Sequence, residues 1–381
     1  MNVTVFGAGL MGATIARDLV KSKRVDYVTI CDVDRRRLRE LSRKEHSPKL
    51  IIKVHDVRKR SETVRLLKES DVGVGALPHG LSDYAIHATI NARVDFVDLI
   101  FGWRFGQGEV SSACRRRGIT IIPACGLAPG LTNILAMAAT EELRRVDEVH
   151  IKVGGIPEKP CPPLNYRIVF SFQAVLEEYL REARIVRNGR VLDVPALSGL
   201  ETIRFPPPIG KCECFYTDGL STLVQTIRNV REMNEKTIRW PGHAEQIGTL
   251  IECGLLETKP VMYHGQSIKP REFVANLLSE KLALHKDEDL TLLRVDVTGK
   301  GIGGTRRQRF EMVDRYDRRH GVTSMARTTG FPCSIAAQTL GSGRISRKGL
   351  VPPELAFKGD LREEYLEYLA DRGMIIQSKF M

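Results

Sequence analysis

The chain lacks any apolar run near the ~20 residues that a membrane-spanning helix needs, and only 6% of its residues are aromatic. Its eight cysteines include no C-x-x-C pair and no partner at zinc-finger spacing. We therefore expect no membrane segment, no metal site, and mostly reduced, buried thiols. Because the first residues already read as a strand, we also expect no leader peptide and a cytoplasmic protein.

Acidic residues are outnumbered, since 46 Asp and Glu stand against 58 Lys and Arg, for a formal net charge of +12. The basic residues gather in short groups at 35–37, 115–117 and 318–319. None of these groups is interleaved with aromatic residues as a nucleic-acid surface would be. We interpret the excess as a solvated basic surface that attracts an anionic cofactor and substrate, and we expect no nucleic-acid partner.

The length of 381 residues exceeds one compact core, so two domains are expected. The first third alternates apolar runs with helical segments, and the expected strands are residues 2–7, 27–31, 50–54, 71–76, 95–98 and 120–123. This alternation predicts an α/β fold with a doubly wound Rossmann domain over 1–130. Extended runs over 131–340 predict an α+β domain for substrate binding and dimerisation, with a largely antiparallel or mixed sheet. The tail, 341–381, is expected to pack back on the first domain.

A glycine-rich turn stands directly after the first apolar run, Val3–Phe6. This arrangement is typical of dinucleotide-binding folds. In that reading Gly7 allows the tight turn, Gly9 lets the pyrophosphate approach the backbone, and Gly12 lets the helix pack against the strand. The helix N-terminus offers N–H groups and a positive dipole end to the phosphates.

An acidic residue, Asp32, ends the second strand 20 residues after Gly12. Its carboxylate would bind the adenosine ribose hydroxyls and repel a 2′-phosphate, which predicts NAD rather than NADP. Arg35–Arg37 leave the alternative open, because they suit either a 2′-phosphate or the solvated start of a helix. Further cofactor contacts are expected at the helix start and the strand ends: Leu10, Met11, Asp56, Val57, Ala76, Leu77, Pro78, Asp98, Leu99 and Cys125.

Longer stretches at 126–130 (GLAPG), 153–157 (VGGIP), 236–239 (KTIR) and 242–245 (GHAE) are more specific than the glycine motif. With it they resemble the saccharopine dehydrogenase-like superfamily, and within it the L-lysine 6-dehydrogenases. The resemblance implies NAD-dependent oxidation of the lysine side-chain amine to 2-aminoadipate 6-semialdehyde, with NADH and ammonia as the other products. It also implies a homo-oligomer, which we expect to be a dimer.

The chain departs from the family pattern at three places near the expected nicotinamide crevice. Ala124 stands where Asp is usual, Ile100-Phe101 where a glycine pair is usual, and Tyr216 where His is common. Two alternatives therefore stay open. One is a saccharopine-type or carboxypolyamine-type dehydrogenase, which needs additional arginines for substrate carboxylates. The other is a non-catalytic NAD-binding sensor or scaffold.

Oxidation of an amine requires that its nitrogen lose a proton, because a lysine amine has a pKa of about 10.4. The candidates for the base are His243, Asp98 and Cys125, with His243 preferred. The structural alternatives are a hydrogen-bonded histidine, a capping carboxylate and a small filler. The residues expected to line the substrate pocket are Tyr166, Arg167, Thr217, Ser221, Thr222, Arg239 and Glu245, of which Arg239 suits a bidentate grip on a carboxylate.

Overall fold

The computed structural model describes residues 1–100, 107–284 and 287–381, which form two compact units. The first unit comprises Met1–Ala138 and Ala326–Met374, and the second comprises Ala139–Met325 and Ile375–Met381. The main segment of the second unit ends at Met325, before the expected boundary at residue 340. The last residues, 375–381, belong to the second unit, although the whole tail was expected to pack on the first domain. Phe101, one of the family departures, lies outside the described residues.

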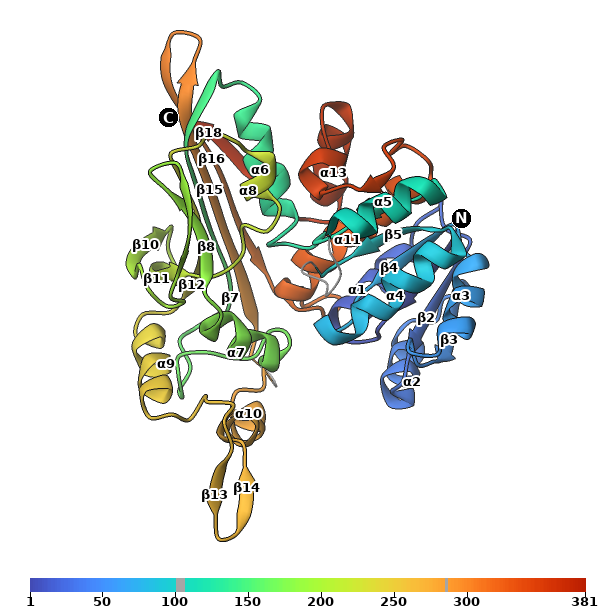
Figure 1. Cartoon of the computed structure of the whole chain (residues 1–381), viewed down its shortest axis with the longest axis horizontal. Helices are drawn as coiled ribbons and strands as arrows, with labels where there is room; N and C mark the ends of the chain where they lie inside the picture. The colour runs from blue at the N-terminus through green and yellow to red at the C-terminus, as the bar shows by residue number, and fades with distance from the viewer. Residues whose placement is uncertain (101–106, 285–286) are drawn as a thin grey trace. The chain divides into compact units, whose positions relative to one another are not determined.

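The first unit is built on a parallel sheet with the strand order β17-β6-β5-β4-β1-β2-β3 over the described ranges (Figure 1). The runs expected to be strands form β1 (Asn2–Phe6), β2 (Tyr27–Asp32), β3 (Leu50–Val54), β4 (Val72–Gly75), β5 (Asp95–Asp98) and β6 (Thr120–Ile122). β1 pairs in parallel with both β2 and β4. The chain returns after residue 340 and adds β17 (Gly349–Leu350) beside β6. The Rossmann-like fold expected from the sequence is confirmed.

Helices connect these strands, and helices cover the sheet because its strands are apolar on both faces. They are α1 (Leu10–Leu19), α2 (Arg35–Lys44), α3 (Arg60–Lys68), α4 (His79–Ala92), α5 (Gln107–Arg117) and α6 (Leu131–Thr140), followed near the C-terminus by α11 (Ser324–Gly341), α12 (Pro353–Ala356) and α13 (Asp360–Asp371). Ile15 and Leu19 of α1 are fully buried. Asp34 begins α2 by accepting hydrogen bonds from the backbone N–H groups of Arg36 (2.8 Å) and Arg37 (3.3 Å).

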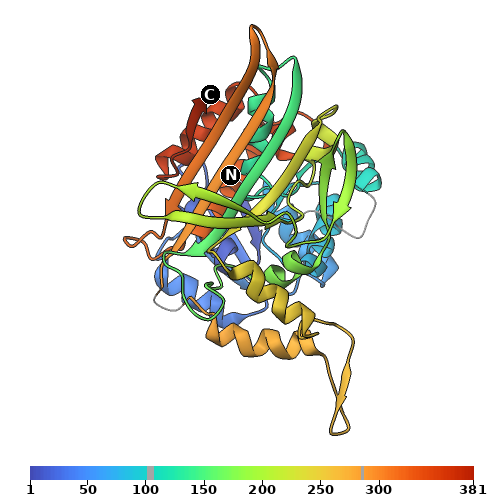
Figure 2. The same cartoon turned by 90° about the vertical axis from the view of Figure 1, so that its left-hand side faces the viewer.

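The second unit is built on a mixed sheet with the main path β10-β11-β12-β7-β15-β16-β18 over the described ranges. Its strands are β7 (Arg145–Pro157), β8 (Ala183–Arg187), β9 (Arg190–Val194), β10 (Glu201–Phe205), β11 (Gly210–Tyr216), β12 (Glu232–Arg239), β15 (Asp289–Gly301), β16 (Gly304–Arg315) and β18 (Gln377–Phe380). Figure 2 shows the long strands β7, β15 and β16 side by side. β12 runs parallel to β7, whereas β15 is antiparallel to it. The expected mixed α+β arrangement is confirmed.

Short helices pack against this sheet: α7 (Phe172–Leu180), α8 (Leu223–Thr226), α9 (His243–Glu252) and α10 (Pro270–Lys281). Val175 and Tyr179 of α7 share a buried apolar cluster with Phe215 of β11 and Ile247 of α9. A separate hairpin of β13 (Val261–Tyr263) and β14 (Gln266–Ile268) precedes α10. None of the helices in the described ranges is long and apolar enough to cross a bilayer.

Candidate functional site

The glycine turn joins β1 to α1 at the point where the strand order reverses, between β1 and β4. Gly7 has φ +99°, and a Cβ there would lie 2.3 Å from the carbonyl oxygen of Ala76 at the end of β4. At Gly12 a Cβ would lie 1.8 Å from the carbonyl oxygen of Gly7, so the turn and α1 pack as closely as glycine allows. At Gly9, by contrast, a Cβ would meet nothing within 4 Å. The open side of the turn is therefore at Gly9, where a phosphate could approach.

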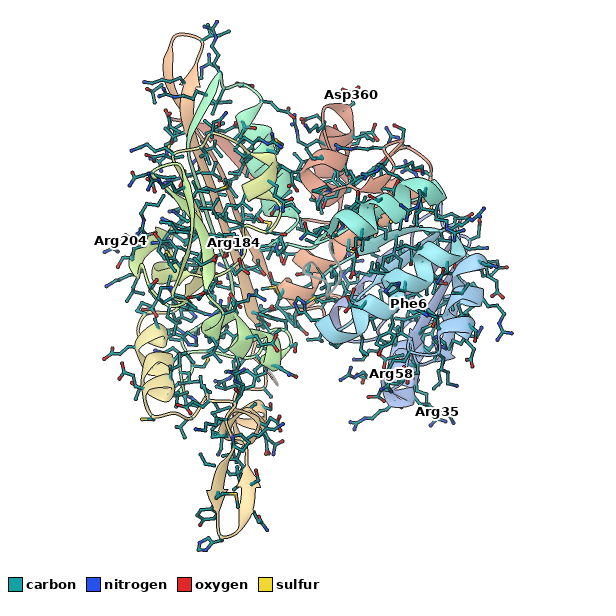
Figure 3. The ribbon with its side chains drawn as sticks, in the orientation of Figure 1. Phe6, Arg35, Arg58, Arg184, Arg204 and Asp360 are labelled. Carbon is teal, nitrogen blue, oxygen red and sulfur yellow. The ribbon has the colours of Figure 1, made fainter. Side chains whose placement is uncertain are left out.

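Asp32 links the end of β2 to this turn. Its Oδ2 accepts a hydrogen bond from Ala8 N (2.6 Å) and its Oδ1 accepts one from Asp34 N (2.8 Å). Each carboxylate oxygen retains a second lone pair that a ribose hydroxyl could use. Arg35 begins α2, and Figure 3 shows its side chain directed away from the sheet. The Arg37 Nε lies 3.4 Å from the Asp34 Oδ2. Residues 35–37 thus form the exposed first turn of α2.

The other strand-end residues take different positions. Asp56 follows β3, and hydrogen bonds from Arg58, at 2.6–3.0 Å, lower the pKa of its carboxyl to about 2. Val57 is buried in the apolar core, so the structure favours a packing role for it over cofactor contact. Ala76 N donates to Phe6 O at 2.8 Å, which holds the ends of β4 and β1 together, and Pro78 precedes α4. Leu10 and Met11 begin α1, with Leu10 exposed, whereas Leu77 packs on the core.

Asp98 and Cys125 lie at adjoining strand ends, where Cys125 N donates to Asp98 O at 2.9 Å. Both side chains are fully buried. The Asp98 carboxylate accepts hydrogen bonds from the Ser82 hydroxyl and from Ile100 N, and Leu99 N donates to Gly75 O. Burial raises the pKa of the Cys125 thiol far above its usual range. A buried, protonated thiol is a poor proton acceptor, so the burial of Cys125 supports a packing role for this residue.

His243, the preferred base, stands at the start of α9 with no exposed surface. Its Nδ1 donates to Leu164 O (2.7 Å), because a carbonyl oxygen can only accept. Its Nε2 accepts from the Tyr179 hydroxyl (2.9 Å). Burial, together with the nearby Arg239 charge, lowers the pKa of His243 to about 3. Both nitrogens are thus engaged within the protein, which supports a structural role for His243 over that of a general base.

Arg239, expected to grip a substrate carboxylate, is also enclosed. Its Nε donates to the Tyr179 hydroxyl at 2.7 Å and its Nη1 to Ile238 O at 2.9 Å. Its guanidinium lies over the rings of Tyr166 and Tyr179, 5.0 and 5.6 Å from their centroids. Glu178 Oε2 lies 3.7 Å from its Nη2. The arginine charge is therefore balanced and covered inside the unit, which supports a structural role for Arg239 over the expected grip on a carboxylate.

The remaining expected pocket residues do not form one group. Arg167 pairs with Asp287 at 2.7 Å and donates to the carbonyls of its own loop, so it fixes that loop. Glu245 lies exposed on α9, and Thr222 is buried before α8. Ser221 has φ +50°, and among the described residues its buried hydroxyl has no hydrogen-bond partner. Tyr166 and Thr217 lie in the buried polar cluster around Arg239.

Two family departures have local explanations. Ala124, with φ +52°, is buried in the turn after β6. The Tyr216 ring lies under the Lys236 ammonium, 4.5 Å from the ring centroid, and makes a cation–π contact with it. Ala124 carries no ionisable side chain, whereas Tyr216 keeps a phenol hydroxyl.

Sequence reasoning missed several buried polar residues of the second unit. Glu213 accepts from Gly242 N (2.8 Å) and Ala244 N (2.7 Å), which fixes the start of α9 and so places His243. Glu235 is buried beside Thr217. For Glu213 the available signal was a glutamate within the apolar run 212–215, whereas β12 is polar along most of its length and gave no such signal for Glu235. In the described part of the chain, no group of three or more His, Cys, Asp or Glu could hold a metal ion.

Known proteins match the chain over both units. Residues 3–122 match the saccharopine dehydrogenase NADP binding domain, and residues 126–374 match the saccharopine dehydrogenase C-terminal domain. The chain belongs to the saccharopine dehydrogenase family. Saccharopine dehydrogenase [NADP(+), L-glutamate-forming] of Saccharomyces cerevisiae is 20% identical over 99% of each chain. A solved apo structure of the yeast enzyme matches with a TM-score of 0.82 and 19% identity over 100% of this chain and 99% of that one.

Other relatives of this saccharopine dehydrogenase family member differ in name and length. Carboxyaminopropylagmatine dehydrogenase of a Synechocystis species is 20% identical over 91% of each chain. Mitochondrial alpha-aminoadipic semialdehyde synthase of Mus musculus is 22% identical over 99% of this chain but only 47% of its own length. The chain thus spans about half of the synthases it matches. These relatives bear out the superfamily and the oxidoreductase class, but not the finer expectation of an L-lysine 6-dehydrogenase.

Proposed function

We propose that this family member is a dinucleotide-dependent dehydrogenase acting on the CH–NH group of a secondary amine that joins two amino-acid parts, as in saccharopine. The observation that carries the substrate class is the match to the L-glutamate-forming saccharopine dehydrogenase over 99% of both chains. The Rossmann-like unit with its open glycine turn supports the cofactor class. L-lysine, the substrate first expected, serves as the comparison in the test.

Besides the amine substrate and the oxidised cofactor, the reaction needs only water. The nicotinamide supplies a hydride acceptor. The substrate carbon loses hydride while its nitrogen, after losing a proton, forms the C=N bond. Water then adds to that carbon and the C–N bond breaks, which gives an aldehyde and a primary amine. The protein contributes orientation and an enclosed site, as in other cofactor-dependent enzymes.

We further propose that Asp32 selects NAD over NADP. Its carboxylate is fixed beside the glycine turn by Ala8 N and Asp34 N, and a fixed negative charge there opposes a 2′-phosphate. The family model that matches residues 3–122 is described as an NADP binding domain. The feature of this chain that would favour NADP is the exposed group Arg35–Arg37. The relative affinity for the two cofactors therefore decides the point.

For the proton transfer, the burial of His243 and Cys125 supports neither of them as the base. We propose that Asp98 acts as a positioning residue, because its carboxylate fixes Ser82 of α4 and the backbone of Ile100 at the carboxyl end of β5. An Asp98→Asn variant keeps a side-chain oxygen and should retain the Ile100 contact. It should lower kcat, while the shape of the pH profile of kcat changes little.

The full chain is mixed with NAD+ or NADP+ and with saccharopine, carboxyaminopropylagmatine or L-lysine, and reduced cofactor is followed by absorbance. We expect NADH with saccharopine and none with lysine. Turnover of lysine but not saccharopine would overturn the substrate class, and cofactor binding without turnover of any amine would favour a sensor. The variant Gly9→Ala should leave the fold unchanged, because its Cβ meets no protein atom within 4 Å. It should abolish turnover, because that Cβ occupies the open side of the turn where a phosphate would approach. Gly248→Ala on α9, equally uncrowded, is the matched control.

A further inference from the structure

Four side chains of the second unit form a continuous row of hydrogen-bonded oxygens. Glu178 of α7 accepts from the Thr237 hydroxyl of β12. Thr237 Oγ1 lies 3.0 Å from Thr217 Oγ1, and Thr217 Oγ1 lies 2.7 Å from Glu235 Oε2. Thr217, Thr237 and Glu235 are buried, whereas the Glu178 side chain is 23% exposed. The row thus leads from a buried carboxyl to a partly exposed one.

Counting hydrogens shows what this row requires. It contains three oxygen–oxygen contacts, and each needs one hydrogen between its two oxygens. The two threonine hydroxyls supply one hydrogen each, and an ionised carboxylate supplies none. With both glutamates ionised, each hydroxyl would point to its own carboxylate, and Thr217 and Thr237 would face each other through lone pairs alone. One neutral glutamate fills all three contacts.

We propose that Glu178, Thr237, Thr217 and Glu235 form a buried proton-binding site that holds one proton shared along the row. The proton rests on Glu235, which donates to Thr217, while Thr217 donates to Thr237 and Thr237 donates to ionised Glu178. The opposite arrangement places the proton on Glu178 with every hydrogen bond reversed. In this change three hydrogens each move along one existing hydrogen bond. The net result is the transfer of one proton from Glu235 to Glu178, and no heavy atom moves.

The surroundings favour Glu235 as the resting place. Burial, with the charges of Glu178 and Asp218, raises the pKa of Glu235 well above its usual value, against the opposing effects of the Thr217 hydrogen bond and the Arg239 charge. Asp218 is itself paired with Arg181 at 3.1 Å. Gly219 packs so closely that a Cβ there would lie 2.5 Å from Glu235 Oε2, which leaves no room for water on that side. Glu178, in contrast, faces the positively charged Arg239 guanidinium at 3.7 Å.

The neighbouring row from Arg239 to Leu164 shows the difference. Arg239 donates to Tyr179, Tyr179 donates to His243, and His243 donates to Leu164 O. Every contact there already has its hydrogen, so that row neither needs nor accepts another. The extra proton is a property of the glutamate–threonine row alone, and it does not depend on the substrate proposed above.

Infrared spectroscopy of the full chain at pH 8 tests this site, because a neutral carboxylic acid has a carbonyl stretch distinct from that of a carboxylate. We expect the band in the unaltered chain, its loss in Glu235→Gln, and its retention in Glu245→Gln, which changes an exposed glutamate of α9. A glutamine at 235 fills the row through its amide N–H and needs no proton. A spectrum of Glu235→Gln identical to that of the unaltered chain would overturn the proposal.

A second pair of variants keeps the test decisive if Glu235→Gln fails to fold. Thr217→Val removes the acceptor of the Glu235 proton, so the band should move to higher frequency, whereas Thr217→Ser keeps the hydroxyl and should leave the band in place. A band that stays unmoved in Thr217→Val would show that the neutral acid lies elsewhere, and the proposal would fail.

Discussion

The Tyr179 hydroxyl joins two buried groups, and its removal is the sharpest test of the polar cluster. It accepts from Arg239 Nε at 2.7 Å and donates to His243 Nε2 at 2.9 Å. Tyr179→Phe keeps the ring and leaves both of those atoms buried without their partner. An unsatisfied buried polar group costs about 1–3 kcal/mol, so the variant should lose about 2–6 kcal/mol of unfolding free energy.

Tyr166 provides a matched control within the same cluster. Its ring centroid lies 5.2 Å from that of His243, compared with 5.4 Å for Tyr179, and both rings contact the Arg239 guanidinium. Among the described residues, the buried Tyr166 hydroxyl has no well-formed hydrogen bond and only a weak contact with the Val169 backbone. Tyr166→Phe removes the same atom from the same surroundings, and should therefore be neutral or stabilising.

Urea unfolding of the two variants, followed by circular dichroism, measures this difference. The midpoint should fall for Tyr179→Phe and stay or rise for Tyr166→Phe, with an unchanged dependence on urea in both. If the two variants differed by less than about 1 kcal/mol, the hydrogen bonds of Tyr179 would not hold the cluster together, and the structural role given to His243 would fall with them.

Further predictions concern the cofactor, the turn, pH and assembly. NAD should bind at least ~10-fold more tightly than NADP, a gap of about 1.4 kcal/mol that Asp32→Asn should narrow in titrations of both cofactors; equal affinities in the unaltered chain would refute the role of Asp32. Gly12→Ala should destabilise the first unit by about 1–3 kcal/mol by overpacking against Gly7, measured by thermal unfolding with and without cofactor. The folded pKa of His243 is about 3 against an ordinary 6.5, so the unfolded chain binds the extra proton between these values; stability should fall by about 1.4 kcal/mol per pH unit as pH drops through that window, a slope absent in His243→Gln. Light scattering should give twice 42.7 kDa for the expected homodimer, and a single species of 42.7 kDa would reject the dimer.

The sequence was sufficient for the Rossmann-like unit because its signals are local. Apolar runs bounded by turn residues predict β1 to β6, and the three glycines of the turn act on neighbours within a few residues. Gly7 does contact Ala76, but the order of strands in a doubly wound sheet already brings β1 and β4 together. Local signals of this kind survive without knowledge of the rest of the chain.

The roles of His243 and Arg239 were not predictable in the same way. The motif at 242–245 indicates a helix start, but what the histidine ring contacts is decided by Tyr179, 64 residues earlier in the chain, and by Leu164. The burial of Cys125 likewise depends on the end of the chain, since Glu354 and Cys333 lie in its surroundings. A reactive residue type in a specific motif does not tell whether its polar atoms face a ligand or the protein interior.

The late addition of β17 has a consequence for how the protein is made. β17 pairs with β6, and Thr120 Oγ1 donates to Arg347 O across 227 residues of chain. A ribosome adding roughly 5–20 residues per second needs roughly 10–45 s to synthesise that distance. Throughout this time the outer edge of β6 has no partner strand, and such an edge can pair with another chain. Newborn chains should therefore depend on protection from aggregation until Gly349 and Leu350 have left the ribosome.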